Sequence, residues 1–271
     1  MKKYLALLLT LAVGMGALAG CGSSSETTTD ETQNTETNTE DTANGADTTE
    51  RTTFTVGFDA EYPPYGYKNE AGEYVGFDLD LAQEVCDRNG WELVKQPIDW
   101  SSKDMELNSG TVDCLWNGFT MTGRESEYTF SEPYVDNSIV FVVRQDSDIQ
   151  TKEDLAGKVV ITQAGSSALT ALTNTENNDE NLALAATFAS LEQTPDYNTA
   201  FMSLETGAVE AVAVDIGVAQ YQLTNHSDKF RQLEEPLSTE QYAIAFKLGN
   251  EALRHQVQGT LDEMVADRSF D

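Results

Sequence analysis

Residues 76–89 read GFDLDLAQEVCDRN, and this stretch carries the signals of one complete helix. Asp78 is a residue type that caps helix starts, while Asn89 and Gly90 can end a helix in the left-handed conformation. The apolar residues between these signals recur at helical spacing: Leu79, Ala82, Val85 and Cys86. The stretch therefore predicts a capped helix with one apolar face.

A strand and an aromatic loop precede this helix. Residues 54–59 (FTVGFD) form a short apolar run that ends in a carboxylate, and residues 61–66 (EYPPYG) are rich in turn formers. This order opens an α/β lobe, although an arbitrary βα unit would have the same order. Residues 76–89 also resemble the signature of the family 3 extracellular solute-binding proteins, the polar amino-acid receptors of ABC importers. The resemblance covers residues 54–271.

The amino terminus has the pattern of an export signal. Residues 1–3 are basic, residues 4–13 are apolar but too short to span a bilayer as a mature helix, and residues 18–21 (LAGC) match a lipobox. We predict that residues 1–20 are a lipoprotein signal peptide and that Cys21 is lipidated. The mature protein would then be anchored to the extracytoplasmic face of the cell membrane through its lipid alone. The alternative is an ordinary secretory signal with a chance cysteine.

The segment after the predicted lipidated cysteine is polar and acidic. Residues 22–53 consist almost wholly of Ser, Thr, Asn, Asp, Glu and Gly, so residues 21–53 are predicted to form a disordered spacer. The formal net charge of the chain is −30, and removing Lys2 and Lys3 with the signal leaves −30 − 2, or about −32. Such a charge argues against nucleic acid or anionic lipid as a partner.

An internal echo indicates two similar lobes. The pattern Met-x-Leu-x-x-Gly-x-Val occurs at residues 105–112 and again at residues 202–209, each time at a predicted helix-to-strand junction. Two similar α/β lobes are the economical explanation. The resemblance implies the same architecture, a two-lobed periplasmic-binding-protein-like fold of type II.

Two stretches are predicted to cross between the lobes. Residues 138–144 (SIVFVVR) fit an outward crossover strand, and the return is expected near residues 236–242. We predict that lobe 1 comprises residues 54–137 and 239–271, and that lobe 2 comprises residues 138–238. Two short crossover strands suit a hinge because they absorb a rotation without disturbing either core.

The last helix is predicted over residues 251–266. Its apolar face is expected to consist of Leu253, Val257, Leu261 and Val265.

A free amino acid carries a carboxylate and an ammonium, so its receptor needs a bidentate cation and a well-placed anion. Residues 117–124 (NGFTMTGR) resemble the carboxylate-binding loop of the family, and residues 130–134 (FSEPY) follow at the expected distance. The resemblance implies that Arg124 binds the ligand carboxylate. Relatives often place this arginine three residues after the threonine, whereas Arg124 is two after Thr122. The alternative is a surface arginine paired with Glu125.

The other residues that the resemblance implies at the ligand come from both lobes. Asp215 ends an apolar strand before a helix, where a carboxylate points into the crevice and would bind the α-ammonium; capping that helix is a compatible role. Asp59, Tyr62 and Trp100 correspond to positions that contact the ligand side chain or wall its pocket, and Gln163 and Ser167 lie on the matching loop of lobe 2. The predicted set is Asp59, Tyr62, Trp100, Asn117, Gly118, Thr120, Thr122, Arg124, Gln163, Ser167 and Asp215.

The cysteines and histidines give no sign of a cofactor or a metal site. Cys86 and Cys114 lie on apolar faces, where buried free thiols are the default and a bridge is the minority interpretation. The short-range disulfide of many relatives is not expected, because Leu93 stands where its second cysteine would be. His226 and His255 lie in unrelated polar contexts.

The predicted function is capture of a free polar amino acid and its delivery to the transmembrane subunits of an ABC permease, by a protein that we expect to be monomeric. The same fold also serves cyclohexadienyl and arogenate dehydratases, but Glu61 is the one candidate for the general acid or base that such an enzyme needs. A receptor's sensor domain would need a transmembrane helix after lobe 2. The pattern leaves glutamine, histidine, arginine, lysine and cystine open as ligands.

Overall fold

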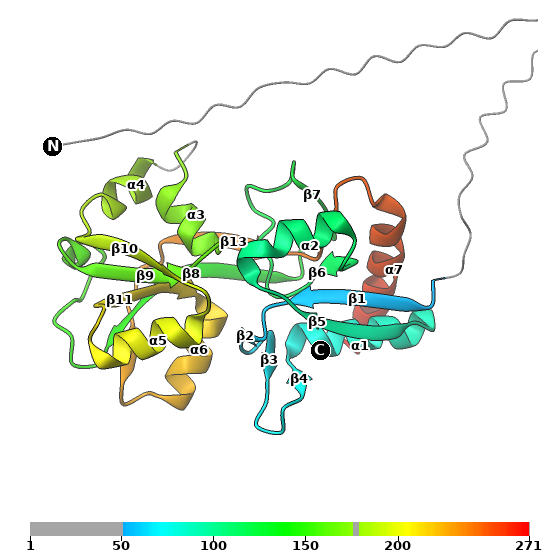
Figure 1. Cartoon of the computed structure of the whole chain (residues 1–271), viewed down its shortest axis with the longest axis horizontal. Helices are drawn as coiled ribbons and strands as arrows, with labels where there is room; N and C mark the ends of the chain where they lie inside the picture. Colours follow the sequence, from blue (N-terminus) through cyan, green and yellow to red (C-terminus); the bar gives the residue numbers. More distant parts are fainter. Residues whose placement is uncertain (1–50, 176–178, 271) are drawn as a thin grey trace, which may run out of the picture. The chain divides into compact units, whose positions relative to one another are not determined.

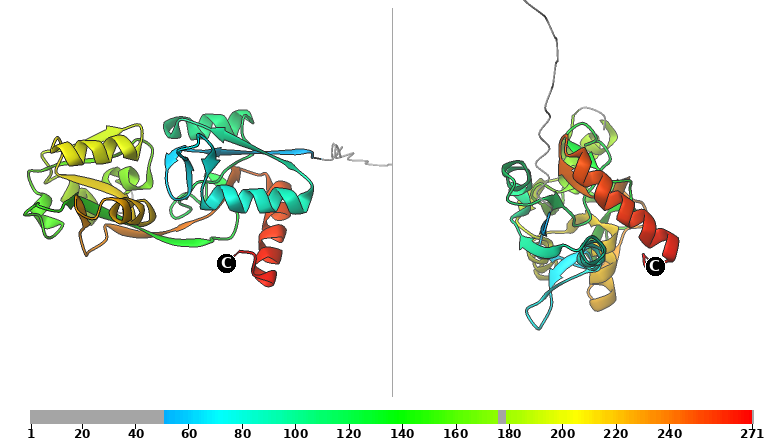
Figure 2. Two further views of the ribbon diagram at one scale, coloured as in Figure 1. Left: turned by 90° about the horizontal axis from the view of Figure 1, so that it is seen from below. Right: turned by 90° about the vertical axis from the view of Figure 1, so that its right-hand side faces the viewer.

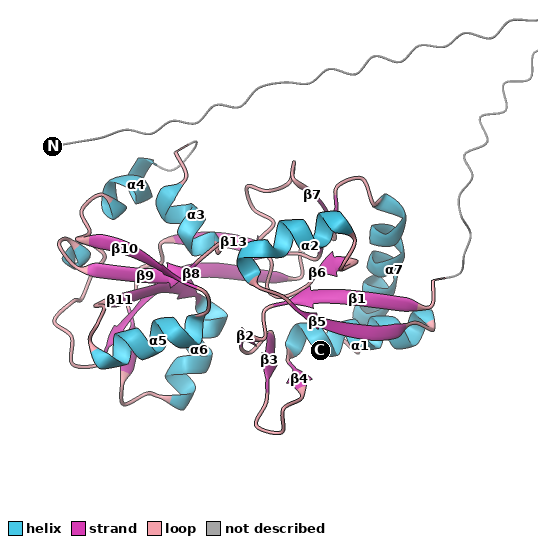
Figure 3. Ribbon diagram, in the orientation of Figure 1, coloured by secondary structure: helices cyan, strands magenta, loops and turns pink. Residues whose placement is uncertain are grey.

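The computed structural model describes residues 51–175 and 179–270, and residues 49–271 group into one compact unit. As the sequence predicts, this unit is built from two α/β lobes (Figure 1, Figure 3). The predicted signal peptide, Cys21 and nearly all of the predicted spacer lie outside the described residues. Within the described ranges, no helix is long and apolar enough to cross a membrane.

Lobe 1 is built on a mixed five-stranded sheet in the order β5-β1-β6-β14-β7. Its strands are β5 (Glu92–Pro97), β1 (Thr53–Phe58), β6 (Cys114–Leu115), β14 (Ala245–Lys247) and β7 (Tyr128–Phe130). Strand β1 pairs in parallel with β5 and β6, and β14 is antiparallel to β6 and β7. The helical elements of this lobe are α1 (Phe77–Asn89), η1 (Trp100–Ser102), α2 (Lys103–Ser109) and α7 (Glu251–Asp267). A small antiparallel sheet precedes α1: β2 (Glu61–Tyr62), β3 (Gly66–Lys68) and β4 (Tyr74–Val75).

Lobe 2 is built on a second mixed sheet in the order β10-β9-β11-β8-β12. Its strands are β10 (Ser190–Thr194), β9 (Val159–Gln163), β11 (Ala211–Asp215), β8 (Val135–Arg144) and β12 (Phe230–Gln232). Its helical elements are η2 (Glu153–Leu155), α3 (Ser167–Thr173), α4 (Asp179–Ala185), α5 (Tyr197–Thr206) and α6 (Ile216–Asn225). The helix after β11 begins at Ile216, so Asp215 ends a strand and precedes a helix, as predicted.

Two antiparallel strands run between the lobes. Strand β8 leads outward from lobe 1, and β13 (Ser238–Tyr242) pairs with its first half on the way back, with Glu240 opposite Asn137. Figure 2 shows the green β8 and the orange β13 side by side in this connection. The return was expected near residues 236–242, where β13 lies. The lobe boundaries at 137/138 and 238/239 remain a prediction.

Helix α1 has the apolar face that the sequence predicts, but not its cap. Leu79, Ala82, Val85 and Cys86 are all fully buried, and Gly90 ends the helix with φ +68°. The predicted cap at Asp78 is wrong: the helix starts after Gly76, and no side chain caps it. Asp78 is buried in the first turn, where it accepts the backbone N–H of Gly118 at 2.6 Å and the hydroxyl of Tyr134 at 2.9 Å. Its carboxylate therefore holds a loop of the candidate site.

The predicted face of α7 is wrong at its last position. Leu253, Val257 and Leu261 are buried, but Val265 is 62% exposed and Met264 is fully buried in its place. In a helix of 3.6 residues per turn, a side chain four residues further on points about 40° away from the first, because four residues exceed one full turn. After three such steps the side chain has left the buried stripe, so Met264 completes it instead.

The internal echo corresponds to equivalent positions in the two lobes. Helices α2 and α5 both end at a left-handed glycine, Gly110 with φ +80° and Gly207 with φ +77°. In both copies of the pattern the Leu and the Val are buried and the Met is exposed. In the described part of the chain both Cys86 and Cys114 are buried free thiols, as the sequence predicts.

Candidate functional site

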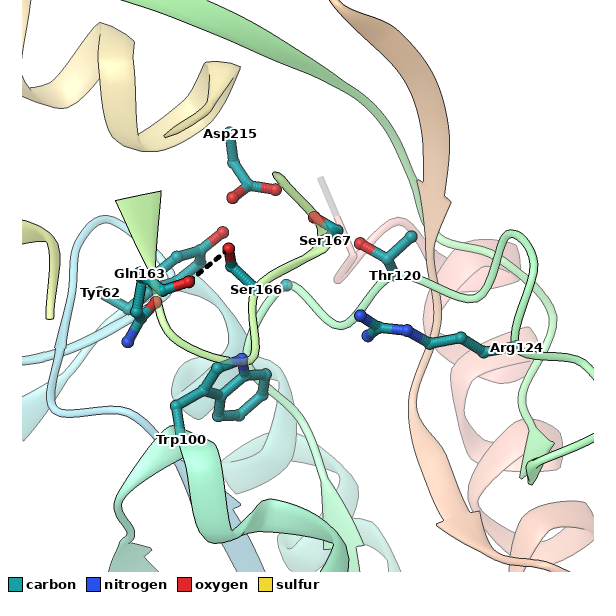
Figure 4. A pocket seen from close by; sticks show the side chains of 9 residues that line it. Tyr62, Trp100, Thr120, Arg124, Gln163, Ser166, Ser167 and Asp215 are labelled. Atoms are coloured by element: carbon teal, nitrogen blue, oxygen red, sulfur yellow. Dashed lines mark hydrogen bonds between the residues drawn. The ribbon is translucent and has the colours of Figure 1, made fainter. Parts of the chain in front are cut away.

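A small cavity lies where the loops of the two lobes meet (Figure 4). Its volume is about 10 Å³, which is about the space of a single water molecule. Eight of the eleven predicted residues line it, together with Ser166: Tyr62, Trp100, Gly118, Thr120, Arg124, Gln163, Ser166, Ser167 and Asp215. Asp59, Asn117 and Thr122 do not line it.

Arg124 reaches the cavity with its guanidinium uncommitted. Its backbone N–H donates to Met121 O in the turn, and its guanidinium carbon lies 5.1 Å from the centroid of the Phe119 ring. No ion pair to Arg124 is present among the described residues, so the alternative pairing with Glu125 is not present. In a chain with 46 acidic and 16 basic residues, such an arginine has its donors free for an anion.

Asp215 approaches the cavity from the opposite lobe and is only 2% exposed (Figure 4). Its Oδ1 accepts the hydroxyl of Tyr242 at 2.6 Å and Nδ2 of Asn137 at 2.8 Å. Oδ2 receives no hydrogen bond from the residues that the structure describes. One carboxylate oxygen is therefore fixed by the crossover strands, and the other is available to a donor in the cavity.

Asp59 and Gln163 meet across the lobes just outside the cavity. Nε2 of Gln163 donates to Oδ2 of Asp59, while Oδ1 accepts the backbone N–H of Glu61 at 2.8 Å. Burial raises the pKa of Asp59 to about 6, because the desolvation of the carboxylate outweighs these hydrogen bonds. Asn117 contacts the backbone of Asp59: its Oδ1 accepts the Asp59 N–H at 3.0 Å. Asn117 therefore positions Asp59 and does not face the cavity.

Buried aromatic side chains form the walls. The hydroxyls of Tyr62 and Tyr242 lie 3.2 Å apart, and the Tyr62 ring stacks on Tyr65 at 5.7 Å. Desolvation raises the pKa of both Tyr62 and Tyr242 well above the ordinary value, so both phenols remain neutral donors. Trp100 also lines the cavity and packs edge-on against Phe119.

Gly118 lies between these walls with φ +58°. A Cβ there would be 2.8 Å from Tyr242 Cε2 and 3.1 Å from Tyr62 Cε1. This position therefore requires glycine, both for its backbone conformation and for the space.

Thr122 faces away from the cavity. It is exposed, and its Oγ1 accepts the backbone N–H of Gln241 at 3.0 Å, which fastens the loop to strand β13. It lines a neighbouring groove of about 280 Å³, which shares Thr120, Arg124 and Ser167 with the cavity.

Glu240 is a site residue that the sequence reasoning missed. It lies on β13, is 9% exposed, and accepts hydrogen bonds from Thr120, Asn137 and Ser167. Burial and the nearby Asp215 raise the pKa of Glu240 to about 7. In β13 the buried Glu240 and Tyr242 alternate with the exposed Gln241, but the sequence does not show this alternation, because Glu240 and Gln241 are both polar.

Lys103 was also missed. This lysine is 6% exposed, and its Nζ donates to the carbonyl of Gly165 in lobe 2 at 3.0 Å. Desolvation, and then the charge of Arg124, lower the pKa of Lys103 below its ordinary value. No signal in the sequence marks Lys103, because a lysine in the first turn of a polar helix is usually solvated.

The candidate acid of the enzymatic alternative lies outside the cavity. Glu61 is exposed and accepts a hydrogen bond from Asn198 of lobe 2. In the described ranges no cluster of three or more His, Cys, Asp or Glu residues could hold a metal ion. The cavity does present two groups that could bind a ligand: the guanidinium of Arg124 and, from the other lobe, Oδ2 of Asp215.

The comparisons with known proteins agree on one family. The family model of the bacterial extracellular solute-binding proteins, family 3, matches residues 54–271. The L-cystine-binding protein TcyJ of Escherichia coli (strain K12) is 28% identical over 221 residues, which cover 80% of this chain and 79% of TcyJ.

Solved structures give the same relationship. The crystal structure of an ABC uptake transporter substrate binding protein from Streptococcus pneumoniae with bound histidine is 30% identical, with a TM-score of 0.74, and the match covers 79% of this chain and 87% of that chain. An ancestral arginine-binding protein bound to arginine is 32% identical, with a TM-score of 0.74, over 82% of this chain and 96% of its own. The chain belongs to the bacterial extracellular solute-binding proteins of family 3.

Proposed function

We propose that this protein captures a free polar amino acid outside the cytoplasm and passes it to the transmembrane subunits of an ABC importer. Arg124 binds the α-carboxylate of the ligand, and Oδ2 of Asp215 accepts its α-ammonium. The observation that carries the proposal is the pair of opposite charges that line one cavity: the guanidinium of Arg124 and Oδ2 of Asp215, neither of which has a hydrogen-bond partner among the described residues. An amino-acid zwitterion supplies the complementary pair of charges.

The known ligands of relatives support the class of ligand. The relatives compared above are described as binding cystine, histidine and arginine, which share the α-amino acid group and differ in their side chains. In this chain the side-chain end would face Asp59, Gln163, Tyr62 and Trp100. A buried carboxylate, an amide and aromatic faces suit a polar head that is uncharged or cationic.

The proposed mechanism of capture is closure of the lobes on the ligand. Arg124 and Trp100 belong to lobe 1, while Gln163, Ser167 and Asp215 belong to lobe 2, so neither lobe alone can desolvate the ligand. The lobes already touch through Gln163 and Asp59, through Lys103 and Gly165, and through Asn198 and Glu61. A cavity of about 10 Å³ cannot hold an amino acid, so these contacts must part before the ligand enters. A ligand then favours the closed state only by its higher affinity for that state.

The proposed location is the outer face of the cell membrane, with the lipid on Cys21 as the anchor. Family membership supports the extracytoplasmic location. Cys21→Ser should release a ligand-competent protein from the membrane fraction, and a variant that stays membrane-bound would overturn the anchor.

A thermal-shift screen tests the function itself. The purified protein is heated with each of the twenty common amino acids and with cystine. A ligand at about a hundred times its dissociation constant stabilises the folded state by about 2.7 kcal/mol, which is a measurable shift in melting temperature. We expect a shift with one or a few polar amino acids. A screen in which none of them raises the melting temperature would contradict the proposal.

A further inference from the structure

We propose that Glu240 competes with the ligand's α-carboxylate for the hydroxyl donors of the cavity, and that an amino acid therefore binds together with one proton. This inference rests on the proposed function, because it assumes an amino-acid carboxylate beside Arg124. It assigns to the returning hinge strand a role in setting the affinity of the site.

The argument starts from the donors around Glu240. Its Oε1 accepts the hydroxyl of Thr120 at 2.6 Å, Nδ2 of Asn137 at 2.7 Å and the hydroxyl of Ser167 at 3.1 Å. These donors come from the arginine loop, the outward crossover strand and the start of α3 in lobe 2. The two hydroxyls line the cavity beside Arg124 and are the side-chain donors that a ligand carboxylate there would use. A carboxylate of the protein itself therefore already occupies them.

The surroundings of Glu240 contain more negative than positive charge. The titratable and charged groups that face it are Asp215 at the end of β11, Tyr197 on α5, Tyr242 on β13 and Arg124 across the shared groove. On β8 the nearest such group is Asp136, which is exposed and accepts Nε2 of Gln241 instead. A single amide, Asn137 Nδ2, bridges Asp215 and Glu240. Two buried carboxylates that share one donor repel each other, so one of them binds a proton readily.

The arrival of the ligand increases this repulsion. A ligand carboxylate bound to Arg124 lies near the same hydroxyls as Glu240, and like charges in a desolvated site disfavour ionisation. Glu240 relieves the repulsion by taking one proton from hydronium or the buffer acid, which leaves a neutral carboxyl group. This group is a weaker acceptor, so it keeps the hydrogen bond from Asn137 Nδ2 and releases the hydroxyls of Thr120 and Ser167 to the ligand carboxylate. The O–H bond of the carboxyl group forms, and the bond from the same proton to water or to the buffer breaks. The reaction is ligand plus protein plus one proton giving the protonated complex.

The sign of the pH dependence follows from this balance. Burial first, and then Asp215, raise the pKa of Glu240 to about 7. A further rise on binding means that the complex holds a proton which the free protein releases above this pH. Affinity should therefore increase as the pH falls from about 8 to about 6.5, by up to roughly tenfold per pH unit for one proton.

The test compares three proteins by calorimetric titration with the best binder among L-glutamine, L-arginine, L-histidine and L-cystine. Glu240→Gln keeps an acceptor oxygen for the three donors and cannot titrate. Asp136→Asn removes the same charge from an exposed residue opposite Gln241, next to Glu240 in the strand pairing. Because all three proteins bind the same ligand, any titration of the ligand itself cancels in the comparison.

Two readouts decide the outcome. The affinity of wild type and of Asp136→Asn should fall as pH rises over this range, whereas that of Glu240→Gln should stay within about twofold. Titration in two buffers of different ionisation enthalpy counts the protons, and wild type should take up a fraction of one proton near pH 7.5 that Glu240→Gln does not take up.

The possible failures are distinguishable. Binding by wild type that is independent of pH, or proton uptake that survives in Glu240→Gln, would overturn the role of Glu240 and leave amino-acid binding intact. Proton release by wild type would show that an ammonium, and not a carboxylate, lies beside Glu240. Absence of binding by all four amino acids at every pH would contradict the proposed function and this inference together.

Discussion

The hydroxyl of Tyr242 donates to Oδ1 of Asp215 across 2.6 Å and so joins the returning crossover strand to the first residue before helix α6. Asn137, on the outward strand, donates to the same oxygen. Both strands of the hinge therefore hold the carboxylate that we assign to the ligand ammonium. A rotation at the hinge should therefore also move the carboxylate of Asp215.

Asp215→Ala should therefore weaken ligand binding and also leave the ligand-saturated protein more open than wild type. The ammonium contact is lost, and with it part of the differential affinity that favours closure. Small-angle scattering measures the opening as the radius of gyration with and without saturating ligand. Asp228→Ala, which removes an exposed carboxylate of the same lobe, is the control and should behave as wild type. Full compaction of Asp215→Ala at saturation would show that closure does not depend on this contact.

Gly118→Ala should destabilise the protein and weaken binding more than Gly123→Ala does. Both glycines have positive φ, +58° and +81°, so both alanines bear the same kind of backbone strain, on the order of 1–2 kcal/mol. At Gly118 the added Cβ also clashes with the rings of Tyr62 and Tyr242. At Gly123 an added Cβ would have no described neighbouring atom within 4 Å. Denaturant unfolding and ligand titration of both variants measure the difference. Equal effects of the two substitutions would contradict the prediction, because they would show that the rings of Tyr62 and Tyr242 move aside without cost.

The ligand-free protein should become less stable as the pH rises from about 5 to about 8. Burial raises the pKa of Asp59 to about 6, and those of Asp78 and Glu240 to about 7, from ordinary values of 3.8, 3.8 and 4.5. The folded state therefore holds protons that the unfolded chain has released, so unfolding is favoured as the pH rises through these values. Each pKa difference of one corresponds to about 1.4 kcal/mol.

Denaturant unfolding at several pH values in this range measures the effect. Glu240→Gln should show a smaller decrease in the free energy of unfolding than wild type, because one of the three carboxyl groups no longer titrates. A free energy that stays constant or rises with pH in wild type would contradict the assignment of these buried acids.

The sequence predicted the elements that local pattern determines. The helix over residues 76–89 follows from apolar periodicity, and the outward crossover follows from an apolar run. The resemblance to the family implies Arg124 and Asp215 from short contiguous stretches. The structure places both of the latter at one cavity. These features were accessible because their signals lie within a few residues of one another.

The rest depends on contacts between distant parts of the chain. Thr120 and Glu240 are 120 residues apart, and Lys103 and Gly165 are 62 apart, so neither pair has a local signal. Asp78 looked like a helix cap because its type and position fit one, yet its carboxylate binds Gly118, 40 residues away. Burial of a charged side chain is decided by the assembled loops, and local composition indicated solvent for each of these residues.

The most direct test of the account is a comparison of two ligands on two proteins. The ligands are the bound amino acid and its α-carboxamide, which keeps the ammonium and the side chain but has no carboxylate. The proteins are wild type and Arg124→Ala, with Lys247→Ala as a control that removes an exposed positive charge outside the cavity. Titrations at about pH 6.5 keep the ammonium of the carboxamide largely protonated.

Wild type and Lys247→Ala should bind the amino acid more tightly than the carboxamide by roughly 30-fold to several thousandfold, since breaking a desolvated charge pair costs about 2–5 kcal/mol. In Arg124→Ala the two ligands should bind within about threefold of each other, because the partner of the carboxylate is gone. If Arg124→Ala still prefers the amino acid as strongly as wild type does, Arg124 does not bind the α-carboxylate and the account of this site is wrong.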